Sequence, residues 1–387
     1  YNASSATTTY KVTNGTISHS ASTKKLSYNG NEQSCANVSV TAPSSGYTIT
    51  YSTSQNGNYS STAPKLTTGG SQTIYYKVNA TNYAEASGSY LCTMAQVTLS
   101  AYSGSTNYPS TKTFTASTNN GGTLSVSPTS GSSNVAIASI SNGTVTATPQ
   151  KTGTQTITVS AAAAGNYAAA SATYTLTVNN GTITASASNK TLTYNGTSGN
   201  NGTAQSCANV TISSPSGTTL TYATKSGSSC GTYDSSAPTL TNVADGPITV
   251  CYKVTKSYYT TVTGEYTCSM NKAAGNVVLS ETSGSTNYPS TKTFTVSTNK
   301  SGGTLTVSPT ATGTGVNATA SISGTTVTMT PRSVGSQEIT VTSAATSNYN
   351  SASATYTLTI NNGTISCPNN ATSCGNKSWT YSPNTSH

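Results

Sequence analysis

The stretch Ser103-Gly104-Ser105-Thr106-Asn107-Tyr108-Pro109-Ser110-Thr111-Lys112-Thr113-Phe114-Thr115 returns without change at residues 283–295, 180 positions later. A second stretch, Ser171-Ala172-Thr173-Tyr174-Thr175-Leu176-Thr177, returns at residues 353–359, 182 positions later. Two long identical stretches at almost the same offset indicate a duplicated folding unit rather than low complexity. The chain is therefore built from repeated modules.

The composition favours β-structure. Of 387 residues only 6% are charged, and 25 tyrosines stand against two phenylalanines and one tryptophan. Tyrosine and the abundant Thr, Val and Ile suit a pleated, half-buried surface, and 33 glycines and 13 prolines punctuate the runs. The sequence therefore predicts an all-β protein with many short strands, and no segment has a convincing helical period.

Polar and apolar residues alternate with a period of two. In residues 174–178, Tyr174, Leu176 and Val178 point one way and two threonines point the other. The run 247–254 behaves alike. One buried face and one wet, threonine-rich face are expected of an antiparallel sandwich. Six or seven such runs fit an Ig-like β-sandwich of roughly 80 to 90 residues.

The repeat predicts a linear tandem array of sandwiches of two alternating types, which we call type A and type B. The predicted parts are the terminal strand of a truncated type-A module (1–16), a type-B module (17–94), a type-A module (95–180), a second type-B module (181–271), a second type-A module (272–362) and the truncated start of a further module (363–387). Asn-Gly-Thr marks the joints at 14–16, 180–182 and 362–364. Because Asn-Gly is a strong turn signal, tight turns and a stiff rod are expected, as a slice of a longer array.

Two stretches of the type-A module, 141–147 (SNGTVTA) and 152–159 (TGTQTITV), resemble the bacterial Ig-like domain of group 2, found in intimin- and invasin-type surface proteins. The type-B module, with 192–196 (LTYNG) and 252–254 (YKV), resembles the MBG-type repeats of large bacterial surface adhesins. The two resemblances cover nearly the whole chain. They imply an extracellular, cell-attached and non-enzymatic role. The cysteines depart from both families, which we associate with few or none.

Four of the eight cysteines recur between the two type-B modules. The sequence around Cys35 returns around Cys207, and the sequence around Cys92 returns around Cys268. Both modules hold the same pair, so we expect the disulfides Cys35–Cys92 and Cys207–Cys268. In the chain-entropy model each would stabilise its module by roughly 4 kcal/mol.

The other cysteines occur once. Cys230 and Cys251 arrive together in the second type-B module and should bond each other, while Cys367 and Cys374 remain as the fourth pair. Parity places Cys251 on the face opposite Tyr252, so this bridge should clip a loop or a neighbouring strand outside the core. Disulfides would place the chain in an oxidising compartment.

Catalytic, metal and cofactor chemistry is not expected. None of the seven carboxylates recurs at the same position in both copies of a module, so no acid–base pair or clustered calcium ligands are predicted. The Cys-x₂₋₄-Cys pairs of structural zinc are missing. The net charge of +9 comes from scattered lysines, which argues against nucleic-acid binding, and no apolar run approaches the roughly 18 residues of a membrane helix.

The contact candidates are tyrosines and sequons. Tyr258 and Tyr259 fall in a loop, whereas Tyr10, Tyr174 and Tyr356 fall on the core-facing side of a closing strand. Chance explains most Asn-x-Ser/Thr sequons in so Ser- and Thr-rich a chain. The candidates for glycosylation on exposed loops and strand faces are Asn37, Asn142, Asn195, Asn209 and Asn317.

The predicted function is that of an extracellular structural or adhesive stalk or fibre at a bacterial cell surface. Its expected partners are copies of itself, joined through nearly charge-free threonine faces, and glycans or proteins of host or neighbouring cells. The alternative is a glycan-binding module. That alternative places the binding loops in the second type-B module, which carries extra residues around 199–201 and 228–230.

Overall fold

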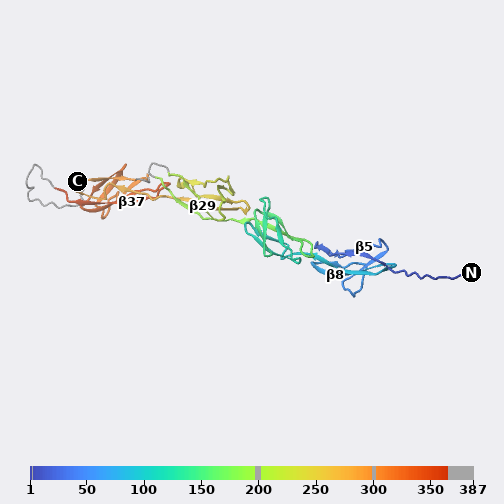
Figure 1. Ribbon diagram of the computed structural model, residues 1–387. Helices are drawn as coiled ribbons and strands as arrows, with labels where there is room; N and C mark the ends of the chain where they lie inside the picture. Colours follow the sequence, from blue (N-terminus) through green and yellow to red (C-terminus); the bar gives the residue numbers. More distant parts are fainter. Residues whose placement is uncertain (2, 197–201, 299–301, 365–387) are drawn as a thin grey trace, which may run out of the picture. The chain divides into compact units, whose positions relative to one another are not determined.

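A computed structural model describes residues 1, 3–196, 202–298 and 302–364, and the predicted pair Cys367–Cys374 lies outside this part of the chain. The chain divides into two compact units, Tyr1–Thr182 with Ser257–Thr260, and Ile183–Lys256 with Thr261–His387. Strands dominate throughout, as the ribbon in Figure 1 shows. The Ig-like all-β class is thereby confirmed. Each unit contains the body of one type-B module and of the type-A module that follows it.

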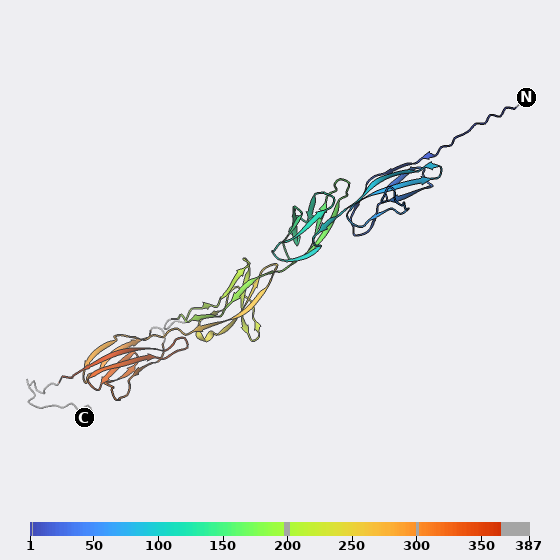
Figure 2. The same ribbon diagram turned by 90° about the horizontal axis from the view of Figure 1, so that it is seen from below.

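The first type-B module (blue in Figures 1 and 2) has one large sheet and several small strand pairs. Its strands are β1 (Gly15–Thr16), β2 (Ser18–Ala21), β3 (Lys24–Ser27), β4 (Gln33–Ser34), β5 (Val38–Ala42), β6 (Tyr47–Ser52), β7 (Lys65–Leu66), β8 (Gly70–Ala80), β9 (Tyr83–Ala84) and β10 (Ala86–Ala95). The large sheet has the order β3-β10-β8-β6, and β2-β5, β4-β7 and β1-β9 form pairs. The core contains Ile74, Tyr76, Val78, Tyr90 and the Cys35–Cys92 bridge.

The first type-A module is a sandwich of two four-stranded sheets. Its strands are β11 (Val97–Leu99), β12 (Ser103–Asn107), β13 (Lys112–Thr118), β14 (Leu124–Ser127), β15 (Ala136–Ser141), β16 (Thr144–Pro149), β17 (Gly153–Ala161) and β18 (Ala170–Asn179). The sheets have the orders β11-β13-β16-β15 and β12-β18-β17-β14. Phe114, Val145, Ile157, Tyr174 and Leu176 are among the residues buried between them.

The second type-B module repeats the large sheet and adds one short strand at its edge. Its elements are β19 (Gly181–Thr182), β20 (Thr184–Ala187), β21 (Lys190–Thr193), β22 (Gln205–Ser206), β23 (Val210–Ser214), β24 (Thr219–Ser226), β25 (Ser229–Cys230), β26 (Thr239–Leu240), the 3₁₀ turn η1 (Val243–Asp245), β27 (Ile248–Thr255), β28 (Tyr259–Thr260) and β29 (Val262–Asn271). The large sheet has the order β21-β29-β27-β24-β25. The strands β19 and β28 pair with each other and belong to the first unit.

The second type-A module repeats the sandwich of the first. Its strands are β30 (Val278–Leu279), β31 (Ser283–Asn287), β32 (Lys292–Ser297), β33 (Leu305–Ser308), β34 (Ala318–Ser323), β35 (Thr326–Pro331), β36 (Gly335–Ser343) and β37 (Ala352–Asn361). The sheets have the orders β30-β32-β35-β34 and β31-β37-β36-β33, which match those of the first copy. In the part of the chain that the structure describes, no helix has the length and apolar character needed to cross a bilayer.

The sandwiches are not purely antiparallel, which corrects the sequence prediction. In every module one early strand runs parallel to the last strand, as in β3–β10, β12–β18, β21–β29 and β31–β37. Parallel neighbours need a long crossover, and here most of the module lies between the two strands. The alternating pattern of a strand fixes its buried face but not the direction of its neighbour, so this pairing could not be inferred from periodicity.

Two of the three Asn-Gly joints, at 14–16 and 180–182, lie in extended strands rather than turns, and this also corrects the prediction. Gly15 and Gly181 lie in β1 and β19, which pair in parallel with β9 and β28. A Cβ at Gly181 would overlap the carbonyl oxygen of Tyr108 and lie 2.6 Å from the Tyr259 ring. Glycine is therefore required at this joint by the close approach of neighbouring groups.

Residues 3–14 form no strand, and Tyr10 is 87% exposed, contrary to its predicted place on a core-facing strand. A β-strand needs a neighbour that satisfies its backbone groups, and the described residues supply none to this segment. The corresponding residues Tyr174 and Tyr356 are fully buried in their modules, as predicted.

Tyrosine and glycine form a recurring pair that explains part of the unusual composition. The Tyr174 ring stacks on Phe114 with 4.0 Å between centroids, and its hydroxyl lies over Gly104 of the parallel strand β12. The second type-A module repeats the arrangement with Tyr356 over Gly284. Because a Cβ at either glycine would overlap the tyrosine hydroxyl, the glycine makes room for the larger ring.

Candidate functional site: cross-links and module joints

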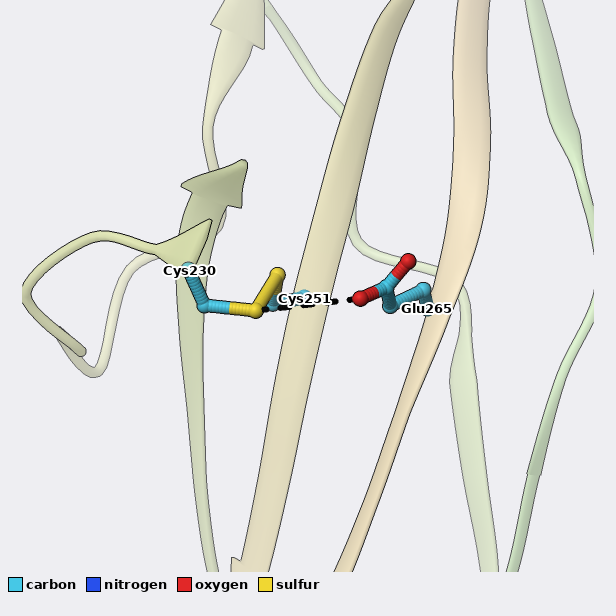
Figure 3. Close-up of side chains that lie close together, drawn as sticks. All are labelled: Cys230, Cys251 and Glu265. Carbon is cyan, nitrogen blue, oxygen red and sulfur yellow. Dashed lines mark hydrogen bonds between the residues drawn. A yellow bond between two sulfur atoms is a disulfide. The ribbon is translucent and has the colours of Figure 1, made fainter. Parts of the chain in front are cut away.

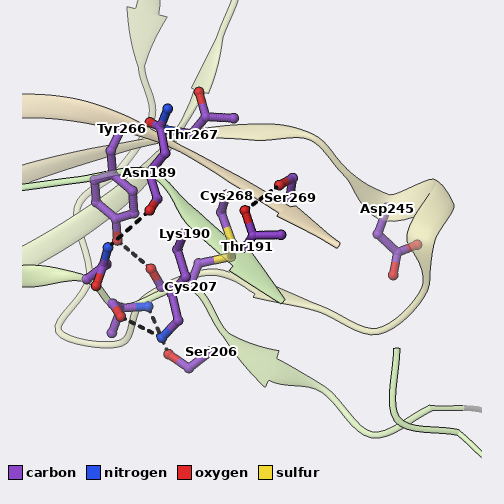
Figure 4. Close-up of a disulfide and its surroundings, with 12 residues drawn as sticks. Asn189, Lys190, Thr191, Ser206, Cys207, Asp245, Tyr266, Thr267, Cys268 and Ser269 are labelled. Atoms are coloured by element: carbon purple, nitrogen blue, oxygen red, sulfur yellow. Dashed lines mark hydrogen bonds between the residues drawn. A yellow bond between two sulfur atoms is a disulfide. The ribbon is translucent and has the colours of Figure 1, made fainter. Parts of the chain in front are cut away.

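The disulfide Cys207–Cys268 lies in the core of the second type-B module and links the segment after β22 to β29. It closes a separation of 61 residues, and both cysteines are fully buried. Figure 4 shows Tyr266 beside the bridge, with its hydroxyl donating a hydrogen bond of 2.5 Å to the Cys207 carbonyl oxygen. Burial raises the pKa of Tyr266 to about 12, because a phenolate is disfavoured in an apolar environment.

The first type-B module repeats this site residue by residue. Cys35 and Cys92 form a disulfide across 57 residues, and Tyr90 donates to the Cys35 carbonyl oxygen over 2.5 Å. Burial again raises the tyrosine pKa to about 12. Both bridges are the pairs that the internal repeat predicts. Tyrosine two residues before the second cysteine is part of the same unit, a role that the sequence pattern alone did not reveal.

The Cys230–Cys251 disulfide fastens the short strand β25 to the outer face of the large sheet. Cys251 alternates with Tyr252 on β27, so it faces away from the tyrosine-lined core, yet the bridge and its surroundings bury it completely. Figure 3 shows the Cys230–Cys251 disulfide, with the Glu265 carboxylate on its other side, and β24 lies between the strands β25 and β27 that the bridge joins. Glu265 pairs with Lys225 over 2.7 Å. The predicted clip outside the core is therefore present.

Cys230, Cys251 and Glu265 are also the group that comes closest to a metal-ligand set among the described residues, with ligand atoms within 4.8 Å of one another. The two sulfurs are bonded to each other, and metal binding requires thiolates. Only the Glu265 carboxylate would remain as a ligand. The arrangement therefore fits a structural cross-link.

The joint between modules in the first unit is fixed by side chains that donate to backbone carbonyls. Lys25 donates to Gly165 over 2.9 Å, Ser27 to Ala169 over 2.6 Å and Thr93 to Asn166 over 2.6 Å. All three acceptors lie in the β17–β18 connection of the type-A module. Only one residue separates β10 from β11, so the chain passes almost directly from one module into the next.

The corresponding joint in the second unit uses different residues. Six residues separate β29 from β30. Lys272 donates to Thr346 over 2.6 Å, and the Asn348 side chain bonds both the backbone of Val243 and the side chain of Asn242. The Tyr349 ring packs edge-on against Tyr194, with 5.2 Å between centroids. The loop between the last two strands of the type-A module, β17–β18 in the first copy and β36–β37 in the second, therefore holds both joints, with different side chains in each.

Tyr258 and Tyr259 pack against Tyr108 of the first type-A module, within the first unit. The ring centroids are 5.3 and 5.5 Å from that of Tyr108, and Gly181 donates to the Tyr258 carbonyl oxygen. Tyr258 has a φ of 68° and is 41% exposed. Tyr259 begins β28 rather than lying in the predicted loop, and the contact that both tyrosines make with Tyr108 is internal to this chain.

Six of the seven carboxylates have polar partners in the structure. Lysines pair with Glu32, Glu85, Glu265 and Glu281 at 2.6 to 3.1 Å. Asp234 accepts the backbone N–H of Ser236, and Asp245 accepts two backbone N–H groups at η1. His19 contacts the Tyr76 hydroxyl at 2.9 Å. These six carboxylates therefore form ion pairs or accept backbone hydrogen bonds.

The five candidate sequons differ in how their amides are used. The side-chain amides of Asn37, Asn195, Asn209 and Asn317 donate hydrogen bonds of 2.7 to 3.0 Å to neighbouring segments. Asn142 is exposed at the hairpin turn between β15 and β16, with a φ of 46°. Among the five, its position is therefore the most open to an attached group.

No protein-family model matches the chain, and no curated protein matches it. Among solved structures it is similar to extracellular cadherin domains 3–6 of protocadherin gamma B2, with 13% identity over 90% of this chain and all of that one, and a TM-score of 0.24. It is also similar to immunoglobulin domains 1–5 of Sidekick-1, with 11% identity over 89% and 81% of the two chains and a TM-score of 0.24. The human desmocollin-1 ectodomain matches with 10% identity over 92% and 79%, and a TM-score of 0.21. At these values the similarities carry no argument about function.

Proposed function

We propose that this chain is part of a non-enzymatic extracellular repeat protein, which acts as a rigid structural or adhesive stalk or fibre at a bacterial cell surface. The observation that carries the proposal is that the module bodies, and the module joint within each unit, are fixed. Disulfides cross-link both type-B modules, and side-chain hydrogen bonds hold a joint within each unit. The bacterial setting rests on the resemblance of the two module types to bacterial surface repeats.

The disulfides support the extracellular part of the proposal, because such bonds form and persist in oxidising compartments. The carboxylates support the non-enzymatic part, because six of the seven serve ion pairs or backbone capping. A stalk holds an adhesive tip at a distance from the cell. Such a chain must therefore be stiff, and it needs no catalytic chemistry.

Self-association is the proposed route from stalk to fibre. Strands β17 and β18 place a ladder of threonine pairs on the outer face of the first type-A module, with Thr156 opposite Thr175 and Thr154 opposite Thr177. These four side chains are exposed and uncharged. An uncharged face lets two copies approach without repulsion or burial of an ion.

We predict that the full chain associates with itself as its concentration rises, and that Thr175→Lys weakens this association. A lysine in the ladder would bring like charges together wherever two such faces meet. Sedimentation velocity over a concentration series, with electron microscopy of the assemblies, measures the effect.

The matched control is Ser132→Lys, which adds the same charge at an exposed loop position of the same module. It should associate like the unaltered chain. A chain that stays monomeric at every concentration would contradict the fibre form of the proposal. If both lysine variants associate equally, the contact between copies does not involve this threonine ladder.

A further inference from the structure

The first type-B module has an open polar groove on the outer face of its large sheet. The groove encloses about 500 Å³, within the roughly 300 to 1,000 Å³ of small-molecule sites. Half-buried Tyr75 of β8 forms part of its surface, with Tyr59 and the exposed side chains of Gln55 and Asn56 on the loop that follows β6. Each of these residues belongs to one module, so the groove depends on no neighbouring module.

The walls of the groove are held in place and carry no net charge. Lys77 pairs with Glu85 over 3.1 Å, and its ammonium lies 5.1 Å from the centre of the Tyr59 ring. The Tyr59 hydroxyl donates to the Gln55 carbonyl oxygen over 3.0 Å. Since the two charges face each other, the groove favours neither an anion nor a cation. It offers an aromatic ring and several hydrogen-bonding groups.

The second type-B module closes the same place with a covalent bond. Tyr75 pairs with Ser52 and Ser89, and in the second module Cys251 takes the place of Tyr75 between Ala223 and Glu265. The lysine–tyrosine contact beside it is kept in both modules. The Lys253 ammonium lies 5.9 Å from the centre of the Tyr233 ring, and the Lys77 ammonium lies 5.1 Å from the centre of the Tyr59 ring.

The change therefore concerns the groove itself. Where the first module presents the Tyr75 ring, the second has the Cys230–Cys251 disulfide, with the Lys225–Glu265 ion pair beside it. One chain thus carries an open and a closed version of one surface.

We propose that the open groove binds a neutral saccharide, with the Tyr75 ring against the apolar face of a sugar and with Gln55, Asn56 and the Lys77–Glu85 pair bonding its hydroxyls. A sugar ring has an apolar C–H face and a polar rim, which matches an aromatic surface surrounded by amide and charged groups. The groove lacks the aliphatic lining that a lipid would need.

This assignment reverses the expectation that the extra loops of the second module would bind glycans. Residues 228–230 form the β24–β25 hairpin that the disulfide fastens over the sheet, and residues 199–201 lie outside the described residues. The inference rests on the proposed extracellular role, because an extracellular chain is one that would meet saccharides. The groove itself is independent of self-association.

The test measures binding of neutral di- and trisaccharides of glucose, galactose, mannose and N-acetylglucosamine to the full chain, by saturation-transfer NMR and calorimetric titration. At least one should bind. Tyr75→Ala should weaken that binding about ten-fold or more, because it removes the stacking surface. Tyr75→Phe keeps the ring and should bind within about three-fold of the unaltered chain.

Tyr233→Ala, at the place in the second module that corresponds to Tyr59, is the matched control and should leave binding unchanged. Gln55→Ala, on an exposed loop, should weaken binding without touching the sheet. The proposal is overturned if none of these saccharides binds, or if Tyr75→Ala binds as well as the unaltered chain. A chain that associates with itself and binds no saccharide would overturn the groove assignment alone.

Discussion

Replacing Cys207 and Cys268 with serine is expected to lower the free energy of unfolding of the second type-B module by about 4 kcal/mol. The bridge closes a separation of 61 residues, and in the chain-entropy model its loss restores that freedom to the unfolded state. Single domains are stable by only about 5 to 15 kcal/mol, so the loss is a large share of the total. Hydrogen exchange of β21 and β29 in the full chain would report it.

Force spectroscopy gives the same variant a second, geometric signature. With the bridge intact, the segment between the two cysteines, a sequence separation of 61, cannot extend when the module unfolds. Without it, this segment adds roughly 140 Å to the length released, at about 3.4 Å per residue, because the intact Cys230–Cys251 bridge still withholds the 21-residue separation that it closes. A variant that unfolds at the same force with no added length would contradict the assigned role of the bridge.

The matched control replaces Cys230 and Cys251 with serine. This bridge spans 21 residues and lies inside the larger loop, so its loss should weaken the module by about 3 kcal/mol and release no additional length while Cys207–Cys268 is intact. Both variants should lower the stability of the module, but only the loss of Cys207–Cys268 should increase the length released on unfolding.

Gly104→Ala is expected to destabilise the first type-A module by about 2 kcal/mol, a typical cost of overpacking a well-packed core. The new Cβ would overlap the Tyr174 hydroxyl, and the Tyr174 ring cannot move aside because it stacks on Phe114. Chemical denaturation of the full chain, followed by hydrogen exchange of β12 and β18, would measure the loss.

Tyr174→Phe should rescue Gly104→Ala, because it removes the atom that the new methyl group meets. The Tyr174 hydroxyl is buried without a hydrogen-bond partner among the described residues, so Tyr174→Phe alone should be neutral or slightly stabilising. A coupling energy of about 1 to 2 kcal/mol is expected in the double-mutant cycle. Gly70→Ala, where a Cβ meets nothing within 4 Å, is the control. Additive effects of the two changes would rule out the proposed contact.

The parts of the structure that depend on a repeated local pattern could be predicted from the sequence. Alternation around Tyr174 fixed the buried face of β18, since side chains on a strand point to opposite faces in turn. The recurrence of Cys35 as Cys207 and of Cys92 as Cys268 reduced a large number of pairings to those in the structure. In both cases the two copies of a module supplied the comparison that a single copy lacks.

Features that depend on two distant segments meeting could not be predicted in this way. Gly181 occurs in an Asn-Gly pair, and its requirement comes from Tyr108 and Tyr259, which lie far away in the sequence. The joint at Tyr349 and the groove at Tyr75 likewise combine residues from separate strands and loops. A turn signal reports local backbone preference, and it cannot distinguish a glycine needed for a turn from one needed for close approach.

Mapping of the disulfides in the unreduced full chain by mass spectrometry tests most directly that each type-B module is a separate, covalently closed β unit. We predict peptides that link Cys35 to Cys92, Cys207 to Cys268 and Cys230 to Cys251, as in the structure, and the remaining cysteines, Cys367 and Cys374, to each other. Free thiols at these positions, or a bridge between the first and the second type-B module, would contradict the account.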